Sequence, residues 1–314
     1  MSDIRELSDT KRVLLEKYLR GEIQEPLKTA NSVSSSSPTE AKQRLEGVTA
    51  LQTSGTKRPF FFLHGHWAGN GFFCFPLAQG LGEDQPFYAL DPYPLDHLRV
   101  LPSLEEMAAE HIKTIRSIQP EGPYLLGGFC NGGLTAYEMA RQLHAAGQKV
   151  DLLVLIDSIP TRLTTLCTFI RRTSQLLGLT PDRQLDWFLR LQHFYRHWRD
   201  GKADESAFLK QFDPRIESPF PPLGILHKEY PAMFIWATAH YVPGFYPGKV
   251  TLFWDSEEPE RSQWWQRMAE GKDQEVEVYR IPGSHKTCKT DHVSGMAAQL
   301  RTCLNEVQSS SVVQ

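Results

Sequence analysis

The sequence lacks the features that mark membrane, secreted and nucleic-acid-binding proteins. Its 314 residues contain no apolar run near the roughly 20 residues that a membrane span needs. Its charged first residues, MSDIRELSDTKRVLLEK, lack the apolar centre of a secretion signal. It also lacks the cationic excess that phosphate binding requires, because the net charge is -3. We therefore expect a cytoplasmic protein that uses neither a membrane nor a nucleic acid.

Cysteine is scarce and irregularly placed. There are five cysteines, an odd number, and no C-x-x-C pair, so neither a disulfide framework nor a zinc site is expected. His64 and His66 look like a metal-binding pair, but no third ligand follows nearby. We expect no metal and no bound cofactor. The cysteines are Cys74, Cys130, Cys167, Cys288 and Cys303.

The chain divides into a polar leading segment and a larger domain. Residues 7–20 have the pattern of a charged helix, and the stretch TANSVSSSSPTEA after them is too polar to pack, so residues 1–57 are interpreted as a helix and a flexible tether. From residue 58 to 314, short apolar runs alternate with helical patterns. Such alternation predicts a mostly parallel sheet with helices on both faces. The runs are PFFFLHG, PFYALDP, PYLLGGF, VDLLVLID, KVTLFWD and VEVYRIPG.

The long gap between the fourth and fifth of these runs predicts an insertion at about residues 160–222. A single crossover helix would need far fewer residues. Within it, LDWFLRLQHFYRHW places apolar residues on one expected helical stripe, either packed against neighbouring helices, which we favour, or turned partly towards an acyl chain as a lid. The stripe comprises Trp187, Phe188, Leu191, Phe194, Tyr195 and Trp198.

The stretch LLGGFCNGG contains a G-x-C-x-G pattern centred on Cys130. It is a variant of the nucleophile elbow, a sharp strand-to-helix turn that raises the central side chain above the sheet. Strand and helix approach so closely there that only small residues fit two positions away, which Gly128 and Gly132 provide. The helix N-terminus would favour a thiolate or an oxyanion at this point. Cys130 is therefore the predicted nucleophile.

The segment after Cys130 has the spacing of an amphipathic helix. Ala136, Met139, Ala140 and Leu143 recur at helical intervals, and Gly147 follows as a stop. The predicted strand, turn and helix are the context that the elbow motif requires.

A cysteine nucleophile needs a base, and His285 follows the last predicted strand, where this type of fold brings its base over the elbow. His292 is a weaker alternative, better suited to a capping or surface role. Two aspartates end strands at the same edge and could orient the imidazole: Asp157 closes VDLLVLID and Asp255 closes KVTLFWD. Spacing alone does not choose between them.

An oxyanion hole is expected from two backbone N–H groups. One belongs to Asn131, directly after the nucleophile. The other is expected from the loop LHGHWAGN after the first core strand, where His66 is the favoured contributor through its main chain.

Three segments together resemble the type I thioesterase domains of polyketide synthases and non-ribosomal peptide synthetases. They are IQPEGPYLLGGFCNGGLTAYEMARQL, YVPGFYPGKVTLFWDSEEP and IPGSHKT, and the likeness extends from about Arg58 to Val307. The family usually has serine where this chain has Cys130, and a different glycine-rich loop where this chain has HGHWAGN.

The resemblance implies an α/β-hydrolase fold with a helical lid, acting on acyl or peptidyl groups that a carrier protein presents on its phosphopantetheine arm. In many such domains the acid follows the strand that corresponds to VDLLVLID, which favours Asp157 over Asp255. Because no carrier, condensation or adenylation pattern is present, we expect a free-standing enzyme.

The cysteine bears on the type of reaction. An acyl group moved from one thiol to another keeps its activation, which favours transfer to an alcohol or amine, including ring closure, over simple hydrolysis. Three hypotheses follow: an acyl-transfer thioesterase with a Cys-His-Asp triad, which we favour, a hydrolytic thioesterase, and a non-catalytic acyl- or carrier-binding module.

Overall fold

The computed structural model describes residues 47–65, 71–96, 98–158, 164–200, 214–255, 263–270 and 274–310. Within them, seven strands form one sheet in the order β1-β3-β2-β4-β5-β6-β7. Every neighbouring pair is parallel except β1 with β3. The strands are β1 (Val48–Gln52), β2 (Phe60–Leu63), β3 (Phe87–Leu90), β4 (Tyr124–Phe129), β5 (Val150–Ile156), β6 (Val250–Asp255) and β7 (Val276–Ile281).

The six strands predicted from apolar runs are all present, β2 to β7 in chain order. The additional strand β1 lies before residue 58, where the sequence suggested that the folded domain begins. It pairs with β3 at the edge of the sheet and is only partly buried, so it carries no continuous apolar run. The sheet therefore begins at Val48. The predicted helix at residues 7–20 lies outside the described residues.

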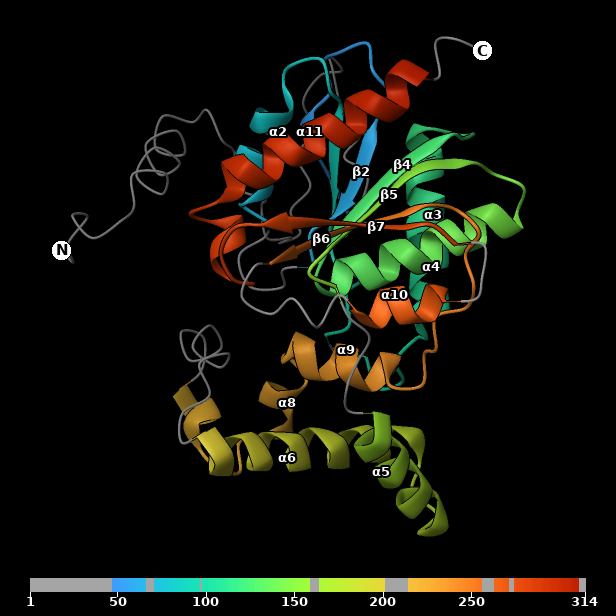
Figure 1. Ribbon diagram of the computed structural model, residues 1–314. Helices are drawn as coiled ribbons and strands as arrows, with labels where there is room; N and C mark the ends of the chain where they lie inside the picture. The colour runs from blue at the N-terminus through green and yellow to red at the C-terminus, as the bar shows by residue number, and fades with distance from the viewer. Residues whose placement is uncertain are drawn as a thin grey trace, which may run out of the picture. The chain divides into compact units, whose positions relative to one another are not determined.

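Alternating side chains of the central strands supply two separate cores. Phe61 and Leu63 of β2 point to the face covered by α3 (Leu104–Ile118) and α4 (Asn131–Ala145), whereas Phe60 and Phe62 point to the face covered by α2 (Cys74–Leu81) and α11 (Val293–Ser310). Figure 1 shows these two helix pairs on opposite sides of the sheet. Burial on both faces explains why the strands are continuously apolar.

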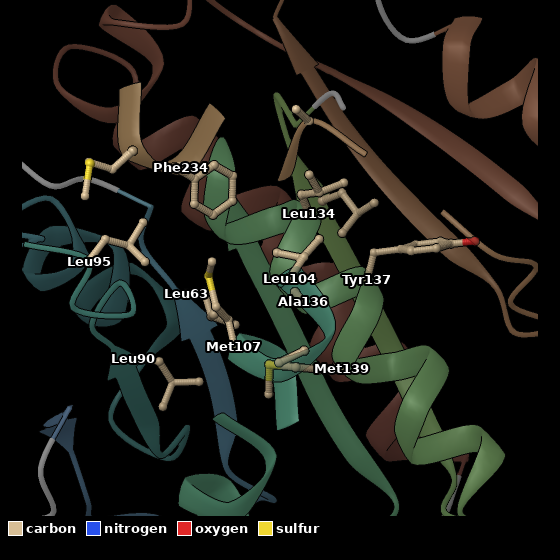
Figure 2. Close-up of a cluster of buried hydrophobic side chains, with 14 of the residues drawn as sticks. Leu63, Leu90, Leu95, Leu104, Met107, Leu134, Ala136, Tyr137, Met139 and Phe234 are labelled. Carbon is tan, nitrogen blue, oxygen red and sulfur yellow. The ribbon is translucent and has the colours of Figure 1, made fainter. Parts of the chain in front are cut away.

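Helix α4 joins the sheet to the inserted helices. Its residues Ala136, Met139, Ala140 and Leu143 are buried, as their spacing predicted, and Gly147 has a φ of 72° just beyond its end. Figure 2 shows Leu134 of α4 to the right of Phe234, which belongs to α9 (Tyr230–Thr238). Both side chains are part of one buried cluster. Helix α4 and an inserted helix thus contribute side chains to the same core.

The insertion between β5 and β6 is helical but extends beyond the predicted residue 222. Two charged contacts link α6 to the segment between α8 and α9: His227 lies 2.7 Å from Asp186, and Arg196 binds both carboxylate oxygens of Glu229 at 2.6 and 2.7 Å. None of the helices in the described ranges is both long and apolar enough to span a bilayer. The described parts of the insertion are α5 (Thr164–Leu176), α6 (Pro181–Asp200), η3 (Pro214–Glu217), α8 (Leu223–Leu226) and α9.

The favoured interpretation of α6 as a stripe packed against its neighbours is wrong for most of its residues. Only Phe188 is fully buried, and it shares the buried face with Leu185 and Leu189. Trp187 lies about 100° away around the helix, so the two adjacent aromatics cannot both face inward. The exposed residues are Trp187 (47%), Leu191 (46%), Phe194 (45%), Tyr195 (49%) and Trp198 (75%).

Candidate active site

The predicted nucleophile, base and acid follow three strands that end at one edge of the sheet. Cys130 comes directly after β4, Asp157 directly after β5, and His285 lies in the loop after β7. The order of the parallel strands places β4 beside β5, with β6 and β7 beyond them. Because parallel strands place their carboxyl ends together, residues far apart in the sequence meet at this edge.

The turn at Cys130 has the backbone of a nucleophile elbow. Cys130 has a φ of 53° and occupies the N-cap of α4. A Cβ at Gly128 would overlap the backbone of Gly132 and Gly133, and one at Gly132 would lie 2.8 Å from the carbonyl carbon of Leu63. The two glycines are therefore required for the close approach of strand and helix, as the motif predicted.

Asp157 is held in a similar conformation. Among the described residues, Cys130 and Asp157 alone combine a side chain with a positive φ, which is 42° for Asp157. Their backbone N–H groups donate to the carbonyls of Ile156 and Phe253, both at 2.9 Å, so the sheet fixes both turns. Strained backbone held by rigid surroundings is concentrated at functional sites.

The side chain of His285 lies between those two residues. Its Nδ1 contacts Oδ2 of Asp157, and Cys130 lies near enough to influence the pKa of the ring. The Sγ atom of Cys130 itself lies 3.9 Å from Oδ1 of Asn131. Burial lowers the pKa of His285, but the hydrogen bond to Asp157 and the interaction with Cys130 raise it, and the result is a pKa of about 9. The imidazolium is thus favoured beside a carboxylate and a sulfur, which is the arrangement needed to hold a thiolate.

The structure describes the side chain of one of the two alternative residues, His292. The backbone of Asp255 ends β6, but its side chain lies outside the described residues. His292 is exposed and lies against Gly283, consistent with a surface role. The structure therefore brings His285, and not the exposed His292, into contact with Asp157.

Of the two residues expected to form the oxyanion hole, the structure describes only Asn131. Asn131 is the first residue of α4, where backbone N–H groups have no partner within the helix. The loop after β2 approaches the elbow, since a Cβ at Gly65 would lie 2.8 Å from the nitrogen of Gly132. His66 lies outside the described residues. The two oxyanion roles stay predictions.

Cys130 differs from the other four cysteines in its accessibility. Cys74, Cys167, Cys288 and Cys303 are buried, whereas Cys130 is half-buried. Burial raises the pKa of the Cys74 thiol well above its ordinary value and that of Cys167 to about 11. Both therefore resist thiolate formation, and Cys130 is the accessible thiol that has an imidazole partner.

In the described part of the chain, no group of three or more histidine, cysteine, aspartate or glutamate side chains is placed to bind a metal ion. His64 is buried, with Nε2 3.3 Å from Oδ1 of Asp91.

Two residues near the site were missed from the sequence, and the contact made by a third, Trp265, was not predicted. The Phe129 ring packs against the His285 ring with centroids 4.8 Å apart, and the Lys289 ammonium lies 4.9 Å from the Phe129 ring centre. The indole N–H of Trp265 donates to the carbonyl of Ser158 at 2.6 Å, directly after the acid. Phe129 stands inside the motif and could have been suspected. The other two have no local signal, because tertiary packing brings them to the site.

The comparisons with known proteins agree on one family. Residues 66–304 match the family model described as Thioesterase domain. The chain is 39% identical over 122 residues to a dimodular nonribosomal peptide synthase of Bacillus subtilis (strain 168), an alignment that covers 38% of this chain and 5% of the relative. It is 25% identical over 280 residues to the inactive atromentin synthetase invA6 of Paxillus involutus, covering 84% of this chain and 28% of the relative.

Solved structures give the same result at the level of the fold. The NocB thioesterase domain from the nocardicin cluster superposes with a TM-score of 0.54 at 26% identity, covering 82% of this chain and 98% of that domain. The Vlm2 thioesterase domain gives a TM-score of 0.54 at 20% identity, which supports the fold alone. The predicted α/β-hydrolase fold with its mostly parallel sheet is therefore confirmed. The chain corresponds to a small part of the synthetases it matches.

Proposed function

The chain belongs to the thioesterase domain family, and we propose that it removes an acyl or peptidyl chain from a carrier-protein phosphopantetheine thioester through Cys130, His285 and Asp157. We further propose that it passes the chain to an alcohol or amine, either of a second molecule or of the chain itself. The observation that supports this most strongly is the contact series from Asp157 through His285 to Cys130 at a strained strand-to-helix turn.

In the first step, the Cys130 thiolate attacks the carbonyl carbon of the incoming thioester. The oxyanion that forms would be stabilised by the backbone N–H groups of Asn131 and His66. The bond from carbon to the pantetheine sulfur then breaks, and the leaving thiol takes its proton from the His285 imidazolium. Asp157 keeps the ring oriented during this transfer. Neither a metal nor a cofactor of the protein's own takes part.

In the second step, the acceptor attacks the acyl-cysteine carbonyl while His285 accepts its proton. The bond to sulfur breaks, the ester or amide leaves, and the Cys130 thiolate and His285 imidazolium are restored. An acyl-serine would have lost the activation of the thioester before this point. Acyl-cysteine retains it, which is the chemical reason for proposing transfer rather than hydrolysis.

The carrier partner is inferred from the relatives. The family members that this chain resembles include a dimodular nonribosomal peptide synthase and non-reducing polyketide synthases. Those proteins' assembly-line setting supports a carrier-bound substrate here. A small-molecule acceptor follows from the proposed second step.

The test is the product formed from a defined acyl thioester. The protein is incubated with carrier-bound or N-acetylcysteamine acyl thioesters and a panel of alcohols and amines, and the products are resolved by mass spectrometry. We expect an acyl-enzyme mass on Cys130 and an ester, amide or ring as product. Free acid alone would identify a hydrolytic thioesterase. Absence of any acyl-enzyme would favour a binding module.

Cys130→Ser separates the role of sulfur from that of the site. We expect the serine variant to acylate and then either stall or shift towards hydrolysis, because the oxoester is less activated. Unchanged product ratios would show that sulfur has no special part in the choice of product.

A further inference from the structure

Lys289 lies beside the reacting groups without belonging to the triad. It ends the short helix η5 (Thr287–Lys289), four residues after His285. A hydrogen bond of 2.9 Å from the backbone N–H of Cys288 to the carbonyl of Ser284 fixes the start of this turn. The Lys289 ammonium lies over the ring of Phe129, the last residue of β4.

The Phe129 ring connects Lys289 with the triad. The ammonium lies 4.9 Å from the ring centre, within the range of a cation–π interaction. The same ring lies 4.8 Å from the His285 ring at an interplanar angle of 32°. Since Phe129 directly precedes Cys130, one side chain holds both the imidazole and the ammonium next to the nucleophile.

The groups around Lys289 are mostly anionic when charged. Burial lowers the pKa of Lys289, while the charges of Cys130, Cys288 and Asp157 raise it and the neighbouring Lys286 lowers it. Cys288 is a buried thiol. The electrostatic partners of Lys289 at the site are thus the nucleophile and the acid.

The net charge of the triad suggests a role for Lys289. With a thiolate on Cys130, an imidazolium on His285 and a carboxylate on Asp157, the triad carries one net negative charge. A net charge in a partly buried site is costly unless it is paired. The ammonium of Lys289 brings the total to zero.

We propose that Lys289 is the counter-charge of the triad and so sets the pH range in which Cys130 is a nucleophile. The inference rests on the proposed function and adds a regulator of the same site. Lys289 acts through its electric field and through Phe129, without touching the reacting atoms, and is therefore a positioning residue.

The sign of the effect follows from electrostatics. A nearby cation favours the thiolate, so it lowers the pH at which the Cys130 thiol ionises. The same cation disfavours the imidazolium, so it also lowers the pH at which His285 loses its proton. Removing Lys289 should move both limbs of the pH profile upwards. Loose packing alone would reduce activity without moving both limbs together.

The experiment compares Lys289→Met, Lys289→Arg and the control Lys286→Met with the wild type, from about pH 4 to about pH 10. One readout is the rate at which iodoacetamide alkylates Cys130, mapped by mass spectrometry. The other is kcat/KM for an N-acetylcysteamine thioester. Lys286 is exposed on the same turn, so its charge is screened by solvent.

For Lys289→Met we expect both limbs to rise by about one pH unit, so that alkylation on the acid limb slows about tenfold at a given pH. Lys289→Arg should keep the wild-type limbs, and Lys286→Met should move them much less. Thermal melting of each variant checks its folding, and Lys289→Gln replaces the Met variant if that one unfolds.

The outcomes separate the two proposals. If Cys130 stays selectively reactive and the charge-removing variant keeps the wild-type pH profile, the role of Lys289 is refuted while the proposed function stands. A lower rate with unmoved limbs also refutes it, because that result indicates packing only. If wild-type Cys130 is alkylated no faster than the buried thiols, the proposed function itself fails.

Discussion

The edge of the sheet and the helical insertion hold their side chains in different ways. At the edge, Cys130 and Asp157 stand on strained turns fixed by backbone hydrogen bonds to neighbouring strands. In the insertion, α6 exposes a row of apolar side chains and is linked to the α8–α9 segment by two charged contacts. Backbone hydrogen bonds thus fix Cys130 and Asp157 at the sheet edge, whereas side-chain contacts hold α6 to the α8–α9 segment.

This difference has a physical consequence. Backbone bonds within a sheet break only when the sheet opens, whereas individual side-chain contacts can break while the rest of the protein stays folded. We therefore expect substitutions at the sheet edge to change turnover or global stability, and substitutions in the insertion to change substrate binding and local opening.

The largest expected effect concerns the acid at the sheet edge. Asp157→Asn should reduce kcat about 10⁴-fold, because the amide no longer holds His285 in the required tautomer. Asp255→Asn is the matched control and should change kcat only a few-fold. Steady-state kinetics on an acyl thioester checks both. The opposite pattern would assign the acid to Asp255.

Two glycine-to-alanine substitutions, one at the sheet edge and one in the insertion, test whether the two regions differ in rigidity. Gly132→Ala should lower the free energy of unfolding by about 3 kcal/mol or more, since its Cβ would overlap the backbone of Leu63. Gly178→Ala, in the turn between α5 and α6, meets nothing within 4 Å and has a φ of 67°, so it should cost about 1 kcal/mol. Denaturant unfolding measures both, and equal costs would contradict the comparison.

The charged contacts of the insertion can be weakened singly. Glu229→Gln removes the charge that faces Arg196, and we expect about 2 kcal/mol less local stability around α6. Hydrogen exchange should speed up there but not in the strands. Glu110→Gln, which breaks the exposed Glu110–Lys113 pair, is the control and should cost less than about 1 kcal/mol. Faster exchange throughout the sheet would show that the insertion is not independent.

The smallest expected effect is on the alkaline limb of the pH profile of kcat/KM, which we attribute to residues at the sheet edge alone. His285 has a pKa of about 9, so its imidazolium is lost as the pH rises through that value. We expect kcat/KM to fall about tenfold per pH unit above it. Glu229→Gln should leave this limb in place. A limb that moves in that variant would mean that the insertion helps to set the charge of the site.

Local patterns were sufficient for much of the core. Apolar runs predicted β2 to β7. The central strands β2 and β4 are continuously apolar because both of their faces are buried, whereas the edge strand β7 is only partly buried and contains Glu277 and Arg280. The elbow was predicted from Gly128, Cys130 and Gly132, because a close strand-helix approach permits only small residues there. Strand β1 was missed because an edge strand exposed on one side needs no apolar run.

Residue patterns along the chain were sufficient to predict the layered fold and the sharp turn at Cys130, because both depend on short-range rules of burial and backbone geometry. Tertiary structure alone decided that Asp157 contacts His285, that α6 exposes its aromatic face and that Lys289 stands beside Phe129. Each of these depends on how elements distant in sequence are placed, and spacing along the chain does not encode that distance.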